Sequence, residues 1–196
     1  MDGTGMRRAV TASGLVLSAG LLAGCTGDGP AETIRSYDVA VEAAADGSLQ
    51  VAETIDYDFG DEERHGIQRL IPERLPHEQT RDRLHPVSDV TVGSPTGAPV
   101  DTELTSEDGV LTVRVGDEDS EVSGRHTYVI SYRVEGVADP GPDRLRWGAV
   151  GTAWDVPIDD VEVRVTGPSG IPPVDGACVV GEADSRTPCA AAIEPG

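Results

Sequence analysis

The sequence predicts an all-β chain, an antiparallel β-sandwich of immunoglobulin-like type with about eight strands. Short runs of alternating apolar and polar residues recur along the chain, and turn signals such as Asp46-Gly47 and Asp108-Gly109 separate them. No segment shows a sustained apolar period of 3.6 residues. A chain of 196 residues has room for one domain with a real core.

The N-terminal residues 1–24 have the pattern of a secretory signal peptide. Arg7 and Arg8 precede an apolar run over residues 9–22, and small residues follow it. The run is shorter than the ~20 residues that a membrane-spanning helix needs.

The end of this leader, Leu22-Ala23-Gly24-Cys25, resembles the bacterial lipobox, in which the cysteine is lipidated and becomes the first mature residue. The alternative is an ordinary signal peptide that ends near an unrelated cysteine. Residues 25–33 are expected to form a flexible tether. Lipidation of Cys25 would hold the chain at the cell membrane, on its extracytoplasmic face.

The sandwich is expected over residues 34–167 and begins with a hairpin. Residues 37–42 and 49–57 alternate in polarity and flank the turn at Asp46-Gly47. Glu53 is the one acid on the apolar face of this hairpin. At a sheet edge it would be solvated, and if buried it needs a partner, for which an arginine is the natural choice.

The later segments continue the same pattern after an interruption. Residues 65–72 are expected to form a short strand or turn that places Ile67 and Ile71 in the core, and residues 73–84 a charged surface loop. Strands are expected at 87–92, 100–104, 110–115, 128–134 and 161–165.

Residues 168–196 are expected to form an irregular tail rich in proline, glycine and alanine. Cys178 and Cys189 remain as an even pair in an exported chain, which predicts a disulfide. Closing a loop of this length stabilises a protein by roughly 3 kcal/mol in the chain-entropy model.

The charge balance argues against two classes of partner. The formal net charge is −20 and every basic residue except histidine is arginine. Such a surface repels the phosphates of nucleic acids and anionic lipid headgroups. We therefore expect no nucleic-acid binding, and contact with the membrane only through the N-terminal lipid.

Six segments, in order, resemble the N-terminal domain of the DUF2207 family of predicted bacterial membrane proteins. The matching segments are Tyr37-Asp38-Val39 with Asp46-Gly47-Ser48-Leu49; Glu53 to Phe59; Arg64-His65-Gly66-Ile67 with Arg69 and Ile71-Pro72; Val87-Ser88-Asp89-Val90; Gly124 with His126 to Tyr132; and Trp147 with Gly151 and Trp154 to Ile158. The resemblance implies an exported β-rich domain and assigns no catalytic residue.

Two features depart from that family. Its members usually continue into a transmembrane helix, whereas this sequence ends at Gly196 without one. The chain is therefore expected to be either a shortened form or one that is anchored by the lipid on Cys25. Gly148 also follows Trp147 where a polar residue would be expected.

His65 is the best candidate imidazole for a hydrolase acting on wall polymer or protein, because acids lie close to it in sequence. No Gly-x-Ser-x-Gly motif accompanies it, so a turn shaped by hydrogen bonds of His65 is favoured. Asp117-Glu118-Asp119 with Glu121 could bind calcium, but lacks the spacing of an EF-hand loop and reads better as a solvated acidic turn.

Both tryptophans lie in the segment 147–158. Trp147 is expected in the core at the start of the penultimate strand, and Trp154 either in the core or on a surface. Trp154, Asp155 and His65 form the candidate binding surface. No catalytic residue, metal or cofactor is assigned, and the favoured function is a non-catalytic envelope module, for protein interaction or structure, whose partner is another envelope protein.

Overall fold

Two β-sheets pack face to face in this computed structural model, which describes residues 32–77, 81–137, 147–168, 177–181 and 185–190. The larger sheet has the strand order β10-β1-β2-β9-β6 and the smaller has the order β3-β8-β7. These two sheets together hold eight strands (five plus three). The predicted all-β sandwich of about eight strands is therefore confirmed. The predicted signal peptide and the predicted lipidation site at Cys25 lie outside the described residues.

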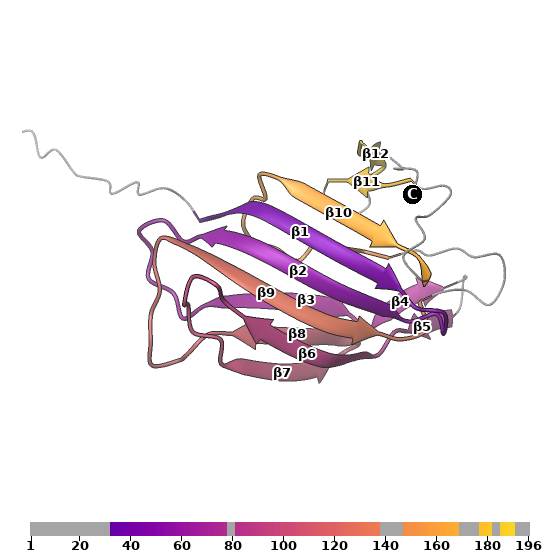
Figure 1. Cartoon of the computed structure of the whole chain (residues 1–196), viewed down its shortest axis with the longest axis horizontal. Helices are drawn as coiled ribbons and strands as arrows, with labels where there is room; N and C mark the ends of the chain where they lie inside the picture. Colours follow the sequence, from indigo (N-terminus) through magenta and orange to yellow (C-terminus); the bar gives the residue numbers. More distant parts are fainter. Residues whose placement is uncertain (1–31, 78–80, 138–146, 169–176, 182–184, 191–196) are drawn as a thin grey trace, which may run out of the picture.

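The larger sheet is built around the predicted hairpin. Its strands are β1 (Thr33–Ala43), β2 (Leu49–Asp58), β6 (Val87–Gly93), β9 (Arg125–Val134) and β10 (Val161–Thr166). The turn between β1 and β2 uses Gly47 at a φ of 83°, a conformation that glycine adopts without strain. Figure 1 shows β10, β1, β2 and β9 side by side in this order.

The smaller sheet contains β3 (Ile67–Pro72), β7 (Thr102–Glu107) and β8 (Val110–Val115), all antiparallel. The turn between β7 and β8 is the predicted Asp108-Gly109, where both residues have positive φ. The strand that was expected at 100–104 begins later and runs to Glu107, because its pairing with β8 starts at Thr102.

Three expectations need correction. Residues 73–84 contain a two-stranded ribbon, β4 (Arg74–His77) with β5 (Arg81–Leu84), rather than a loop. The tail is likewise not wholly irregular, since β11 (Val179–Val180) pairs with β12 (Thr187–Pro188). Finally, residues 147–158 form no strand, so Trp147 does not begin one.

One strand pair is parallel, contrary to the all-antiparallel expectation. β10 runs parallel to β1, with Val39 opposite Val163. The segment before β10 already pairs in parallel with the start of β1, where the Ile34 N–H donates to the Pro157 carbonyl and the Asp159 N–H donates to the Ile34 carbonyl, both at 2.9 Å. The chain therefore enters β10 at the same end as β1 and runs in the same direction.

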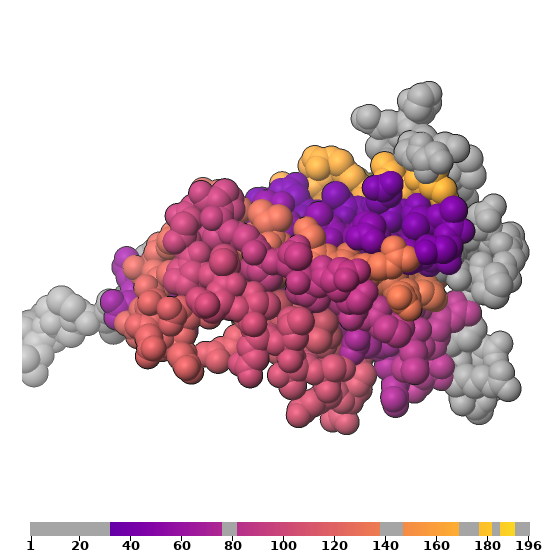
Figure 2. Space-filling view, turned by 60° about the horizontal axis from the view of Figure 1, so that its bottom comes forward, coloured from indigo at the N-terminus to yellow at the C-terminus, as the bar shows by residue number. Residues whose placement is uncertain are grey.

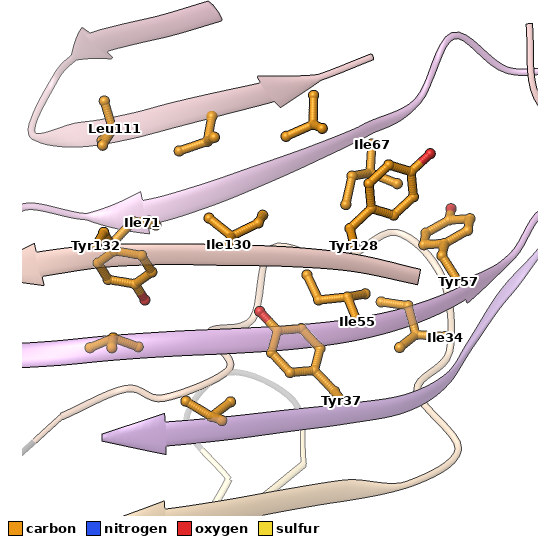
Figure 3. Packing of buried hydrophobic residues seen from close by; sticks show 14 of the residues in the cluster. Ile34, Tyr37, Ile55, Tyr57, Ile67, Ile71, Leu111, Tyr128, Ile130 and Tyr132 are labelled. Atoms are coloured by element: carbon orange, nitrogen blue, oxygen red, sulfur yellow. The ribbon is translucent and has the colours of Figure 1, made fainter. Parts of the chain in front are cut away.

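The core lies between the two sheets. Alternate residues of β1, β2 and β9 point inward, and the hydroxyls of Tyr37 and Tyr132 point toward a common region (Figure 3). Ile67 and Ile71 of β3 are buried opposite them, as expected. The predicted disulfide joins Cys178 and Cys189, whose Cα atoms are 5.5 Å apart.

Candidate functional site

The most unusual feature of the molecule is a buried ion pair that joins the two sheets. Glu53 on β2 is 0% exposed and Arg69 on β3 is 2% exposed. The Arg69 Nε donates to Glu53 Oε2 at 2.9 Å, and its Nη2 donates to Oε1 at 2.8 Å. This two-bond geometry matches the planar guanidinium to the carboxylate, which is the strongest form of such a pair.

Two tyrosines complete the coordination of the carboxylate. The hydroxyl of Tyr37 donates to Glu53 Oε2 at 2.7 Å and that of Tyr132 donates to Oε1 at 2.6 Å. Each oxygen of Glu53 therefore accepts two hydrogen bonds. A buried charge is tolerated only when it is paired and its remaining hydrogen-bonding capacity is satisfied, and this carboxylate meets both conditions.

The buried surroundings shift the pKa values of the three side chains that donate to Glu53. Burial works against the charged form of Arg69, but its hydrogen bonds and attraction to Glu53 outweigh this, so the pKa of Arg69 is raised. Burial, followed by the negative charge of Glu53, raises the pKa of Tyr37 and Tyr132 above the ordinary value. Both phenols consequently stay neutral and remain donors well into the alkaline range.

The segment 147–158 covers this network. The Arg69 Nη2 also donates to the Ala149 carbonyl at 3.3 Å, and a Cβ at Gly151 would lie 3.1 Å from Arg69 Nη1. The ring of Trp154 meets that of Tyr37 edge to face, with centroids 5.7 Å apart. The segment is therefore attached to the core by both a polar and an aromatic contact.

Both tryptophans are half-buried and pack against the core. For Trp154, the core alternative is favoured by its contact with Tyr37, while Asp155 beside it is exposed. The indole N–H groups of Trp147 and Trp154 are buried and have no hydrogen-bond partner among the described residues. The proposed surface at Trp154 is thus smaller than a fully exposed ring would offer.

His65 lies in an exposed loop that leads into β3, and none of its contacts in the described residues is with Trp154. Its Nδ1 is 3.2 Å from the carbonyl oxygens of both Asp117 and Ser120, and its Nε2 is 3.8 Å from the Glu121 carboxylate. Within the part of the chain that the structure describes, no serine hydroxyl is hydrogen-bonded to His65. The ring binds one loop to another, which is the arrangement expected for a turn-shaping histidine.

A pair of glycines brings these loops together. Gly66 and Gly116 have φ values of 125° and 134°, and a Cβ on either would collide with the backbone of the opposite loop. Beside them, Arg64 and Val122 exchange backbone hydrogen bonds of 3.0 and 2.7 Å. Only glycine allows the two chains to approach this closely.

A second polar cluster lies where β1 begins and β2 ends. Glu32 accepts a hydrogen bond from the Tyr57 hydroxyl at 2.7 Å and forms an ion pair with Arg64. Burial, followed by the bond to Glu32, raises the pKa of Tyr57, and the charge of Asp155 adds to the rise. Arg64 of this cluster directly precedes His65, although no contact between Asp155 and His65 is seen in the described residues.

The acidic loop borders an open hollow of about 340 Å³. Its carboxylates do not converge on one point, since Asp117 instead accepts hydrogen bonds from the Asp119 N–H at 2.7 Å and the Ser120 hydroxyl at 3.3 Å. In the described ranges, no group of three His, Cys, Asp or Glu side chains is placed to hold a metal ion. The hollow is lined by Asp101, Thr102, Glu103, Arg114, Gly116, Asp117, Glu118 and Asp119.

From the sequence we expected an arginine beside Glu53 if Glu53 is buried, but the sequence did not indicate that the partners are Arg69, Tyr37 and Tyr132. A signal was present, because Arg69 lies two residues after Ile67 and two before Ile71 and so shares their inward face. Which arginine reaches Glu53 depends on how the two sheets stack, and a pattern along one strand does not contain that information.

No helix among the described residues is long and apolar enough to cross a bilayer.

Comparison with curated protein sequences gave no significant match. Among solved structures, leukotriene A4 hydrolase from Saccharomyces cerevisiae matches with 14% identity and a TM-score of 0.31, over 52% of this chain and 15% of that one. An M1 zinc metallopeptidase from Deinococcus radiodurans matches with 15% identity and a TM-score of 0.38, over 79% of this chain and 37% of that one.

The chain thus spans well under half the length of these two proteins, and likeness at this level assigns no activity to it. A family model describing the N-terminal domain of a predicted membrane protein, DUF2207, matches residues 33–188. That range begins at β1 and ends at the last residue of β12, so it covers both sheets, the buried ion pair and the segment above it. The chain therefore belongs to the DUF2207 family of predicted membrane proteins.

Proposed function

We propose that this chain is an exported cell-envelope domain, anchored by a lipid on Cys25 to the extracytoplasmic face of the cell membrane. There it acts as a non-catalytic module that binds another envelope protein or supports envelope architecture. Its membership in a family of predicted membrane proteins supports the membrane location. The finer claims rest on the lipobox and on the chemistry of the folded domain.

The observation that carries the proposal is the position of the lipobox relative to the fold. Cys25 precedes Thr33, the first residue of β1, by eight residues (33 − 25). A chain of eight residues reaches at most about 29 Å when fully extended. A lipid on Cys25 would therefore keep the sandwich close to the membrane, with the start of β1 nearest to it.

The non-catalytic role is supported by how the domain uses its reactive groups. Glu53, Arg69 and the two tyrosine hydroxyls are bound to one another inside the core, where a substrate has no access. His65 is engaged with backbone carbonyls. Neither group offers the free nucleophile and nearby base that hydrolysis requires.

The anchor is tested by expressing the full chain and its Cys25→Ala variant in a bacterium and separating membrane from soluble fractions. We expect the parent chain in the membrane fraction and a size shift when globomycin blocks lipoprotein processing. The variant should lose both properties, whereas Thr26→Ala, one residue later, should keep them. A Cys25→Ala chain that still fractionates with the membrane would overturn the lipid anchor.

A further inference from the structure

β10 is an edge strand of the larger sheet, and among the described residues no other strand pairs with its outer edge. Its sequence alternates Val161, Val163 and Val165 with Glu162 and Arg164. The valines continue the inward face of Tyr37, Val39 and Val41 on β1, but the smaller sheet does not cover them fully. Val161 and Val163 remain 41% and 42% exposed, and Figure 2 shows the yellow atoms of β10 at the surface beside indigo β1.

Within the described residues, the backbone of β10 also has hydrogen-bonding groups that no other strand uses. The Tyr37 N–H donates to the Asp160 carbonyl at 3.0 Å. In a parallel ladder, this places the N–H and C=O groups of Glu162 and Arg164 toward β1, and those of the three valines toward the open edge. The β11–β12 ribbon lies beyond β10 in Figure 1, but no hydrogen bond joins the two among the described residues.

The other sheet edges carry features that prevent pairing. β6 has a register irregularity between Ser88 and Thr91, with Asp89 at a φ of 54°. β7 presents Glu103 and Glu107, which would repel a second copy of itself. β3 is bordered by the segment 147–158 through Ala149. Bulges, like charges and covering segments are the common means of blocking an edge strand, and the part of the chain that the structure describes places none of them at β10.

We propose that two copies of this chain associate through β10, antiparallel and edge to edge, around a two-fold axis that passes through Val163. Val163 then faces Val163 of the second copy, and Val161 faces the second Val165. Each facing pair of valines then exchanges two backbone N–H···O=C hydrogen bonds, because the N–H and C=O groups of the valines point to this edge. The two five-stranded sheets become one continuous sheet.

Charge complementarity selects this register. Glu162 of each copy faces Arg164 of the other, on the outer surface and at the unbonded positions, where Cα atoms lie about 4.5 Å apart and side chains are closest. Within one chain, Glu162 and Arg164 already form an exposed ion pair of 2.7 Å. Shifting the register by one step would instead oppose the two Glu162 carboxylates or the two Arg164 guanidinium groups, which is unfavourable.

The first test co-expresses two differently tagged copies of the full chain and measures how much of one is captured with the other. We expect efficient capture for the parent chain and at least tenfold less for Glu162→Arg with itself or Arg164→Glu with itself, because each opposes like charges across the axis. Mixing Glu162→Arg with Arg164→Glu should restore capture. The pair within each chain is lost in both variants, so only pairing between chains explains the recovery.

The matched control is Arg114→Glu, which reverses an exposed charge on β8, the central strand of the other sheet, where Arg114 pairs with Glu103, and it should leave capture unchanged. Failure of the parent copies to associate would overturn the proposal. Equal capture by the single variants, or no recovery on mixing, would overturn it as well.

A second test uses Val163→Cys in the full chain. The axis places the two introduced thiols on residues about 5.5 Å apart at Cα, within the range of a disulfide. Mild oxidation of membranes should give a cross-linked dimer, while Leu104→Cys, on the exposed β7, should not. A dimer band of equal strength from both variants would point to random collision and contradict the two-fold contact.

Discussion

The strongest prediction concerns the replacement of Glu53 by alanine. The change removes a carboxylate that accepts two hydrogen bonds from Arg69 and one each from Tyr37 and Tyr132. Arg69 is 2% exposed and cannot reach water without opening the sandwich. Its guanidinium would remain charged in the core, since its pKa lies far above neutrality, and both phenols would lose their acceptor.

The expected cost follows from these losses. Removing one partner of a buried ion pair destabilises a protein by about 3–5 kcal/mol, and each hydrogen bond to a charged group contributes about 1.5–3 kcal/mol. These terms overlap, so we expect a loss of at least about 4 kcal/mol for Glu53→Ala. Tyr37→Phe and Tyr132→Phe should each cost about 1–3 kcal/mol. Domains are typically stable by about 5–15 kcal/mol, so this loss is a large share of the total, and we expect an unfolded fraction of the alanine variant even without urea.

The assay is urea unfolding of the chain, followed by tryptophan fluorescence, with the m-value checked for two-state behaviour. Arg114→Ala, which breaks the exposed pair with Glu103, is the control and should change the unfolding free energy by less than about 1 kcal/mol. The double replacement Glu53→Leu with Arg69→Met should be less destabilised than Glu53→Leu alone, because no unpaired charge remains. A loss below about 1 kcal/mol for Glu53→Ala, or additive losses in the double variant, would refute this account.

Three further predictions concern other parts of the molecule. Burial raises the pKa of Tyr128 to about 12, so its neutral form favours the folded state. The contribution of Tyr128 to stability should be constant below pH 10 and fall as the pH rises toward 12, and Tyr128→Phe should reduce this slope in urea titrations. Hydrogen bonds from the Ser48 hydroxyl and N–H, and then from Arg133, lower the pKa of Asp46 to about 2. The ionised Asp46 should therefore stabilise the folded state above pH 4, and this contribution should fade as the pH falls toward 2. A carboxyl titration by NMR that gives an ordinary pKa for Asp46 would contradict this. Gly66→Ala should lower the melting temperature strongly, by an unfolding cost above about 2 kcal/mol, whereas Gly148→Ala, with open space around its Cβ, should have little effect.

Local patterns in the sequence determined the strand content of this protein. Alternation of apolar and polar residues has the period of a strand, and Asp46-Gly47 and Asp108-Gly109 suit positive φ, so the hairpins could be predicted from neighbouring residues alone. The disulfide between Cys178 and Cys189 followed from cysteine number and context. An arginine beside Glu53 could also be inferred from the sequence, because a buried charge requires a partner.

Only the tertiary structure decided which groups meet. Arg69 reaches Glu53 because β3 stacks on the larger sheet, and Trp154 meets Tyr37 because the segment before β10 runs beside the start of β1. This parallel pairing continues into β10 and leaves the valines of β10 partly exposed. These contacts join residues far apart in sequence, and their geometry depends on sheet order and stacking, which no single strand specifies.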